Sequence, residues 1–499
     1  MWAAAAVAIA GPAEVVRGRD IELFFQSNPD GMIRPDEVVW SFDQTPFDML
    51  GTTISSFGGP RFRLSAGIGE GEEGDRTSSV IVRVAVIGAP SIYAQHTVWL
   101  TGPRERGEWR FITIGQDHTL GITWYNELYT WGRGIGGQLG RPNTIGEGST
   151  ILEARARPGF VNMGQGHNWL TVTGGLFHSV GLRHDGALYT WGRNNHGQLG
   201  RVTTGDTYAP GRVGTGLWSH VAAGSNHTLG IMADGSLWAW GTNVEGQLGT
   251  GDNVNQPSPT RVGSGGQHNW RWSSVSTNAE HSVAIRTDGT LWTWGQNQHD
   301  QLGHTGGNNN TLGEVSHPTA GRTWVAASAG DGFTVALDDQ DRLWAWGNDA
   351  QGQLGPNGPG PGAAGLATRT HIPVEVPQQG GRGWRSINIG HHHTMAIDAD
   401  RRLFAWGSNS HGQVTYDTAR GAHPDLIEVP AQGPHAGLGW VSASGGGWYS
   451  LAVQADGTLW AWGANDHGQI GNGLQASATA NTPITQISRY AIPGPAAWR

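Results

Sequence analysis

The sequence predicts an all-β protein: a seven-bladed β-propeller preceded by a β-sandwich. Three observations support this prediction. Of the 499 residues, 81 are Gly and 25 are Trp; the dipeptide Trp-Gly recurs seven times after residue 109; and the first hundred residues show alternating apolar segments without this repeat. Many short alternating segments separated by Gly-rich turns are typical of sandwiches, barrels and propellers.

Residues 1–103 are predicted to form a separate domain. Their alternating segments indicate six or seven short strands. The pattern around Phe25, Trp40 and Gln95 resembles that of immunoglobulin-like domains. The resemblance implies a β-sandwich with Trp40 in its core, and with Phe25 and Gln95 at positions where such domains often carry a disulfide.

Each later repeat carries signals for four short strands. Residues 218–240, WSHVAAGSNHTLGIMADGSLWAW, give a strand, a Gly-containing turn, a second strand, an Asp-Gly hairpin and a third strand. A fourth strand is expected upstream of each repeat, at Pro-x-x-Val motifs such as 210–213. Four antiparallel strands make one propeller blade, so residues 104–499 are predicted to form seven blades.

The tryptophans of the repeat keep a fixed register. One Trp begins each Trp-Gly pair and another lies 22 residues before it. A residue required in every repeat is explained most simply by packing between blades, so we interpret the set as structural framework and not as a ligand-stacking surface. The fourteen residues are Trp109, Trp131, Trp169, Trp191, Trp218, Trp240, Trp272, Trp294, Trp324, Trp346, Trp384, Trp406, Trp440 and Trp462.

The ends of the repeat array predict a closed ring. The first repeat lacks its upstream Pro-x-x-Val strand, and a spare segment at 483–487 follows the last repeat. We expect this C-terminal strand to complete the first blade. Closure of this kind would remove the exposed strand edges that an open array leaves.

The repeat motif resembles the regulator of chromosome condensation repeat family. The residues that carry the resemblance are WG-x-N-x-x-GQLG, as in WGRNNHGQLG and WGTNVEGQLG, together with the preceding Gly, His-Ser/Thr and Asp-Gly. It spans residues 105–490 and implies a seven-bladed β-propeller. Local departures are Gly134 in the first repeat, Asn278 and Asp300 in the fourth, and Val414-Thr415 in the sixth.

The composition argues against several classes of function. The formal net charge is -9, and no run of basic residues is present to neutralise phosphates, so we expect no nucleic-acid binding. Without Cys there is no disulfide, Cys-zinc site or thiol nucleophile. The apolar run Trp2 to Ala10 lacks basic residues and is too short for a bilayer span. We therefore expect synthesis in the cytosol without a signal peptide, and no membrane insertion.

No motif predicts an active site. Five of the 21 His share one repeat register, and we interpret them as framework side chains hydrogen-bonded to neighbouring backbone. The run His391, His392 and His393 is expected on one strand, where alternating side chains cannot all reach one ion. A GxGxxG pattern at 69–74 is interleaved with acids that would repel phosphate. The sequence thus predicts no catalytic, cofactor-binding or metal-binding residue and leaves the partner-binding residues open.

A non-enzymatic structural or binding function is therefore expected. By analogy of fold, the sequence favours a tailed-phage virion component, either a decoration, fibre or attachment protein. Residues 1–103 would join a larger assembly, and propeller loops would contact a protein or a cell-surface receptor. The expected location is the virion surface or the medium after lysis, with the cytoplasm as the alternative. Two other functions stay open: a propeller similar to β-lactamase inhibitors, and a guanine-nucleotide exchange factor for a small GTPase.

Overall fold

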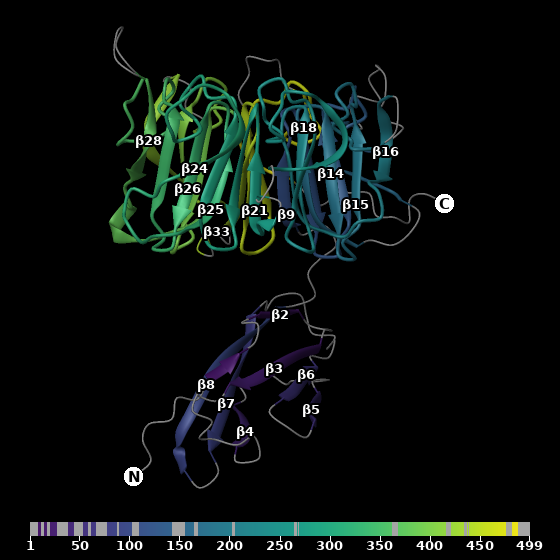
Figure 1. Cartoon of the computed structure of the whole chain (residues 1–499). Coiled ribbons are helices and arrows are strands. Elements are labelled where there is room, and N and C mark those ends of the chain that lie inside the picture. Colours follow the sequence, from purple (N-terminus) through teal and green to yellow (C-terminus); the bar gives the residue numbers. More distant parts are fainter. Residues whose placement is uncertain are drawn as a thin grey trace. The chain divides into compact units, whose positions relative to one another are not determined.

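The computed structural model describes the propeller from Trp109 to Ile487 and, before it, the backbone of eight strands (Figure 1). Gaps in this description fall at residues 142–154, 164–167, 202–204, 264–266, 268, 362–367, 416–420, 434–436, 438 and 476–481. The chain divides into two compact units, Met1–Glu105 and Arg106–Arg499. No helix in the described part is long and apolar enough to cross a membrane.

The first unit contains two four-stranded sheets, with strand orders β1-β3-β6-β5 and β2-β8-β7-β4. Its strands are β1 (Ala8–Ala10), β2 (Glu14–Val16), β3 (Asp20–Gln26), β4 (Val38–Asp43), β5 (Thr53–Phe57), β6 (Arg61–Ser65), β7 (Thr77–Val86) and β8 (Ala89–Thr101). The side chains expected to form an immunoglobulin-like core, Phe25, Trp40 and Gln95, lie outside the described side chains, as does the 69–74 loop. The immunoglobulin-like assignment therefore stays a prediction.

The second unit is a propeller of seven four-stranded antiparallel sheets. Blade 1 consists of β9 (Trp109–Ile114), β10 (His118–Thr123), β11 (Leu128–Gly132) and β12 (Gly159–Phe160), and blade 2 of β13 (Trp169–Gly174), β14 (His178–Arg183), β15 (Leu188–Gly192) and β16 (Thr207–Arg212). Blade 3 consists of β17 (Trp218–Ala223), β18 (His227–Met232), β19 (Leu237–Gly241) and β20 (Gln256–Arg261), and blade 4 of β21 (Trp272–Thr277), β22 (His281–Arg286), β23 (Leu291–Gly295) and β24 (Asn309–Val315).

Blades 5 to 7 follow the same plan. Their strands are β25 (Trp324–Ala329), β26 (Phe333–Asp338), β27 (Leu343–Asn348) and β28 (Arg369–Val376); β29 (Trp384–Ile389), β30 (His393–Asp398), β31 (Leu403–Ser408) and β32 (Ala422–Val429); and β33 (Trp440–Gly445), β34 (Tyr449–Gln454), β35 (Leu459–Gly463) and β36 (Thr482–Gln486). A short 3-10 turn, η4 (Gln379–Gly381), precedes blade 6.

The hairpins between the second and third strands confirm the turn prediction. Gly186, Gly235, Gly289 and Gly457 of the Asp-Gly pairs all have φ between 79° and 83°, where Gly has no steric penalty. The other three blades place Asn126, Asp341 and Arg401 at the same turn position, with φ between 57° and 64°. These three blades therefore carry a left-handed non-Gly residue that needs local hydrogen bonds to hold it.

Each blade is contiguous in sequence, and its first strand is innermost. The first strands of neighbouring blades contact one another around the whole ring, including β33 with β9. The fourth strand is outermost and pairs with the third strand of the same repeat, as β16 does with β15. The prediction that the fourth strand belongs to the following repeat is therefore wrong. After the loop that follows the Trp-Gly pair, the chain returns and pairs antiparallel with the third strand of the same repeat.

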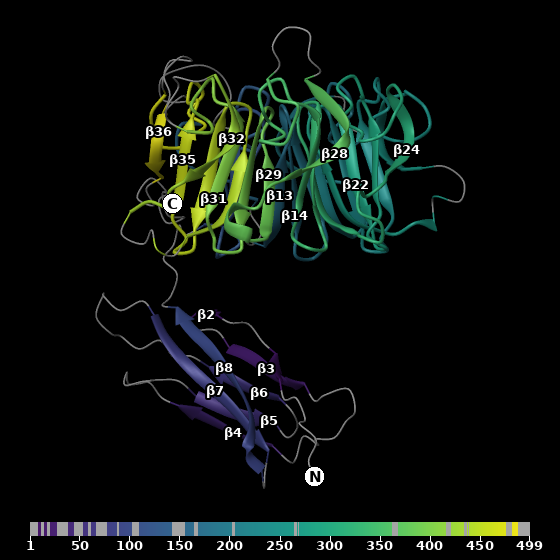
Figure 2. The ribbon, with the colours of Figure 1, turned by 90° about the vertical axis from the view of Figure 1, so that its left-hand side faces the viewer.

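The C-terminal strand also completes a different blade from the one expected. β36 pairs with β35, in the register Trp460 with Gln486 and Ala461 with Thr485, and Figure 2 shows it at the outer edge of blade 7. Blade 1 has its own outer strand, β12. The ring is consequently closed by side-chain packing and hydrogen bonds between blades 7 and 1, and no strand among the described residues is shared across that junction.

Candidate functional site

The tryptophans of the Trp-Gly pairs fasten each blade to its neighbour. Each indole Nε1–H donates to the main-chain oxygen of the Gln in the preceding blade's GQLG-like loop, over 2.8 to 3.0 Å. The set closes on itself, because Trp131 of blade 1 donates to Gln469 of blade 7 at 2.9 Å. All fourteen register tryptophans are at most 5% exposed, so none offers its ring face to a ligand.

A second ring of hydrogen bonds runs beside the first. The Ser or Thr at the second position of each second strand donates its hydroxyl proton to the same Gln oxygen, over 2.7 to 3.0 Å. In five blades the preceding His lies with Nε2 2.9 to 3.2 Å from the next blade's hydroxyl. A hydroxyl has one proton to give, and the Gln oxygen receives it. The hydroxyl must therefore accept from Nε2–H.

These five histidines are neutral framework residues. Burial lowers the pKa of each to about 3, and neighbouring imidazoles lower it further in three of them. With the proton on Nε2, each Nδ1 is an unprotonated nitrogen without a hydrogen-bond partner. They are His118, His178, His227, His281 and His393. The expected partner, neighbouring backbone, is therefore wrong: the structure places a hydroxyl of the next blade there, so each His joins two neighbouring blades.

Blade-specific residues gather at one end of the propeller. This end, here called the turn face, is formed by the turns between first and second strands and by the loops after the Trp-Gly pairs. Main-chain N–H groups of these turns donate to the next blade's turn at six of the seven junctions, for example Leu176 to Ser225 (3.2 Å) and Gly447 to Gln116 (3.1 Å). The backbone of the turn face is thus tied together, while its side chains differ from blade to blade.

Blades 1 and 2 place two arginines against one aromatic ring on the turn face. The guanidinium carbons of Arg133 and Arg193 lie 5.0 and 4.0 Å from the centroid of the half-buried Phe177 ring. Arg133 is also paired with Asp117 at 3.0 Å, whereas Arg193 has no carboxylate partner among the described residues. Stacking on an aromatic ring holds a guanidinium in place and leaves its N–H groups for an acceptor on a partner.

Blades 5 to 7 place an aromatic and imidazole group on the same face. Trp448 is half-buried between His392 and His411, with ring centroids 5.4 and 5.0 Å away. His392 Nε2 lies 3.5 Å from a carboxylate oxygen of Asp331. Trp is enriched among the side chains that carry most of the binding energy at protein interfaces.

The three consecutive histidines do not share a strand. His391 and His392 lie in the turn, and only His393 belongs to β30. This differs from the predicted strand geometry, because His391 and His392 complete the three-residue turn that begins at Gly390, as in the other blades. Among the described residues no group of three His, Asp or Glu is arranged to hold a metal ion.

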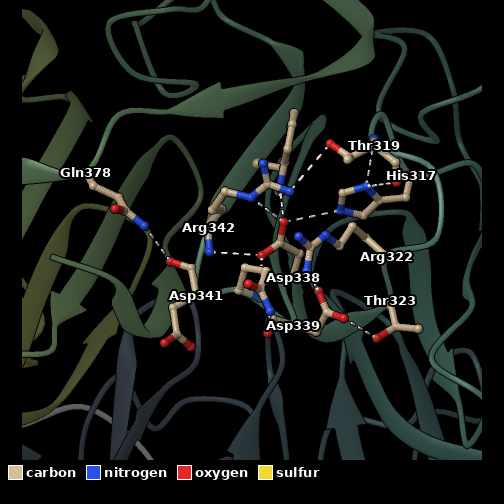
Figure 3. Close-up of polar contacts among 11 residues, drawn as sticks. His317, Thr319, Arg322, Thr323, Asp338, Asp339, Asp341, Arg342 and Gln378 are labelled. Carbon is tan, nitrogen blue, oxygen red and sulfur yellow. Dashed lines mark hydrogen bonds and ion pairs between the residues drawn. The ribbon is translucent and has the colours of Figure 1, made fainter. Parts of the chain in front are cut away.

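Outside the repeat register, one cluster combines an acid, a His and an Arg (Figure 3). The buried carboxylate of Asp338 accepts hydrogen bonds from Arg342 Nε at 2.8 Å and Trp344 Nε1 at 3.1 Å. His317 Nε2 lies 3.4 Å from the same oxygen, and His317 Nδ1 accepts from the Thr319 N–H at 2.9 Å. Nδ1 is therefore hydrogen-bonded inside the protein, whereas Nε2 makes only this 3.4 Å contact with the carboxylate. The cluster fastens the blade 5 hairpin to the connection that leads out of blade 4.

Replacing Asp338 with Asn should destabilise the propeller by about 2 kcal/mol, because the buried carboxylate loses its charge-assisted hydrogen bond with the partly exposed Arg342. Burial raises the pKa of Asp338, but the hydrogen bonds from Arg342, Gln340 and Trp344 outweigh it and lower the pKa overall. Asp339 is the matched control: its exposed pair with Arg322 spans 3.5 Å, so Asp339→Asn should cost less than about 1 kcal/mol. Urea unfolding of both variants measures the difference, and equal costs would contradict this account.

The closed ring and its blade-specific face define the protein as a seven-bladed propeller of the protein-binding type. Residues 144–492 match the RCC1-like domain family model, and the chain belongs to that family. The family resemblance drawn from the Trp-Gly repeats is thereby confirmed. RCC1-like propellers are generally non-enzymatic.

Two curated relatives come from Arabidopsis thaliana. The chain is 28% identical over 368 residues to the ultraviolet-B receptor UVR8, and 28% identical over 369 residues to the mitochondrial RCC1 domain-containing protein RUG3. Each match covers 72% of this chain and 66% of the relative, so the chain spans slightly less than two thirds of these proteins.

Solved structures show the same fold. Human WBSCR16 superposes with a TM-score of 0.60 at 20% identity, covering 70% of this chain and 88% of that protein. Yeast RCC1 (Prp20), solved with Kap60 bound, has a TM-score of 0.60 at 19% identity, covering 76% and 85%. At these identities the likeness concerns the fold alone.

Proposed function

We propose that this protein is a non-catalytic binding protein that holds a protein partner on its turn face. The proposal rests on the contrast between residues that recur in every blade and residues that differ from blade to blade. The register tryptophans, which recur in every blade, are buried and make their contacts within the ring. Residues that differ between blades, such as Arg193, Phe177 and Trp448, are half-exposed and concentrated at one end. Aromatic and Arg side chains on a rigid scaffold are typical of protein-binding surfaces.

The comparisons support a protein as the partner. Yeast RCC1 has been solved bound to Kap60, and another structure of it is described with its binding to Gsp1p and histones. These partners belong to yeast RCC1 and identify none for this chain. The relatives reported above are plant and other eukaryotic proteins, and they give no support to the expected phage virion role. The attachment role expected for residues 1–103 falls on side chains outside the described residues.

A charge reversal on the turn face tests the proposal. The full-length protein is used to recover a partner from its native cells, and the recovered partner is then titrated against purified variants. Arg193→Glu and Trp448→Ala should each weaken binding by about thirtyfold, because an interface hot spot contributes 2 kcal/mol or more.

The matched control changes the same charge at the opposite end of the propeller. Arg382 is paired with Asp400 at 2.9 Å, and its side chain is 56% exposed. Arg382→Glu should leave the affinity within about twofold, since surface changes away from an interface have small effects. Binding that survives both turn-face variants and is lost with Arg382→Glu would reverse the assignment of faces.

A further inference from the structure

The junction between blades 7 and 1 differs covalently from the other six. Since every blade is contiguous in sequence, the chain passes directly from one blade to the next at six junctions. At the seventh, blades 7 and 1 meet only through non-covalent contacts among the described residues. Any opening of the ring without local unfolding of a connection must begin at this junction.

The hydrogen bonds at this junction repeat those found elsewhere. Trp109 N–H donates to Gly457 O at 3.2 Å and Gly447 N–H donates to Gln116 O at 3.1 Å. The same two bonds at the junction of blades 2 and 3 join Trp218 to Gly186 (2.9 Å) and Leu176 to Ser225 (3.2 Å). The main chain therefore gives the unlinked junction no additional stabilisation that would replace the missing covalent link.

One side chain distinguishes the junction of blades 7 and 1 from the others. Where five blades carry the buried His, blade 7 carries Tyr449, which is fully buried. Its hydroxyl lies 3.0 Å from the hydroxyl of Thr119 in blade 1. Thr119 donates its own proton to Gln469 O at 3.0 Å, so Tyr449 is the donor to Thr119. Tyr449 thus makes the same bond as the histidines, across the one junction that lacks a chain connection.

Protonation affects these two kinds of residue differently. A buried imidazole whose pKa burial lowers to about 3 must gain a proton when its surroundings open below pH 6.5. Burial raises the pKa of Tyr449 well above its ordinary value, so its phenol stays neutral in acid and in neutral solution. The charge that acts on Tyr449 is that of Asp117, which also raises its pKa and is paired with Arg133 at 3.0 Å. The groups that act electrostatically with His178 are the neutral imidazoles of His118 and His227.

We propose that the Tyr449–Thr119 pair is an acid-resistant latch, which keeps the ring closed at its unlinked junction under conditions that loosen the histidine-linked junctions. At this junction Tyr449 takes the place of the titratable His that donates the equivalent hydrogen bond in five other blades. It is also the one junction where loss of that hydrogen bond would separate the two ends of the ring. The five histidine-linked junctions tolerate weakening because the chain itself crosses them.

Hydrogen exchange of the full-length protein at pH 7.5 and pH 5 tests the latch. The amides of Trp109 and Gly447 report on the junction of blades 7 and 1, and those of Trp218 and Leu176 on the junction of blades 2 and 3. Between these pH values, opening at a His-linked junction should become about thirtyfold more favourable, because one imidazole is protonated only in the open state. In the wild-type protein we expect this change at Trp218 and Leu176, and less than threefold change at Trp109 and Gly447.

Two variants complete the test. Tyr449→Phe should lower protection at Trp109 and Gly447 about fivefold at both pH values, as expected for loss of one hydrogen bond. Tyr449→His should give the wild-type protection of Trp109 and Gly447 at pH 7.5. At pH 5 the protection of these two amides should fall about thirtyfold. The proposal is overturned if the wild-type protein loses protection equally at both junctions in acid, or if Tyr449→His shows no new pH dependence. The wild-type comparison decides the question even where a variant fails to fold.

Discussion

Acidification from pH 7 to pH 5 should sharply destabilise the propeller. The five ring histidines have a pKa of about 3 in the folded protein and about 6.5 when unfolded. Below pH 6.5 the unfolded chain binds up to five more protons than the folded one. Each proton changes the free energy of unfolding by about 1.4 kcal/mol per pH unit. The stabilising contribution is therefore complete above pH 6.5 and is lost progressively as the pH falls toward 3.

One buried carboxyl opposes this trend. Asp349 occupies the position that carries Asn in five other blades, and burial raises its pKa to about 6. Its carboxylate accepts hydrogen bonds from the Leu354 and Gly360 N–H groups. The folded state therefore holds one additional proton between the unfolded pKa near 4 and pH 6. Stability from this group is present at low pH and lost as pH rises through 6. One such group reduces the effect of five histidines without reversing it.

Denaturant unfolding at pH 7.5, 6.5 and 5.5 measures the proton uptake directly from the slope of stability against pH. His393→Phe reproduces the arrangement found naturally at Phe333, whose ring is fully buried in the same register. This variant should take up one proton fewer on unfolding. His196, exposed on the turn face, is the control, because His196→Phe removes an imidazole that water already reaches. A stability that does not change between pH 7.5 and 5.5 would show that the buried imidazoles do not govern acid unfolding.

The sequence predicted the number of blades and the framework positions because both depend on strict repetition. Seven Trp-Gly pairs require seven equivalent environments, and the structure places each of those indoles in the same contact with the preceding blade. The Asn of the WG-x-N-x-x-GQLG motif likewise keeps one role: Asn194 and Asn243 accept hydrogen bonds from the Leu199 and Leu248 N–H groups at 3.1 and 2.9 Å. Periodicity alone was sufficient for these assignments.

Two features could not be predicted from the periodicity of the sequence. The fourth strand lies between two register tryptophans, so the repeat fits equally well with either neighbour. Only the pairing of β36 with β35 decides which blade it completes. The turn face was missed because its side chains come from different blades. A signal for it existed: the turn before each second strand varies, with Phe177, Asp331 and Trp448 at or beside positions where other repeats carry small or polar residues.

Removing residues 481–499 should abolish stable folding of the propeller. The deletion takes away β36, which leaves β35 as an exposed edge with unpaired main-chain groups. It also takes away Ile487, which is 4% exposed and packs in the core cluster that joins Trp109 and Trp131 of blade 1 to Leu459 of blade 7. The loss thus falls on blade 7 and on the closing junction together. We expect aggregation or a melting temperature lowered by more than 15 °C, measured by calorimetry and light scattering.

Two point variants within the deleted segment separate packing from unspecific effects. Ile487→Ala should cost about 2 to 4 kcal/mol, because it empties part of a buried cluster. Gln486→Ala, at an exposed position of the same strand, should cost less than about 0.5 kcal/mol. The deletion must lower the free energy of unfolding by more than Ile487→Ala does, since it removes the strand pairing as well as the side chain. A truncated chain that melts with the full-length protein would mean that blade 7 is stable with three strands and that closure of the ring does not depend on its last strand.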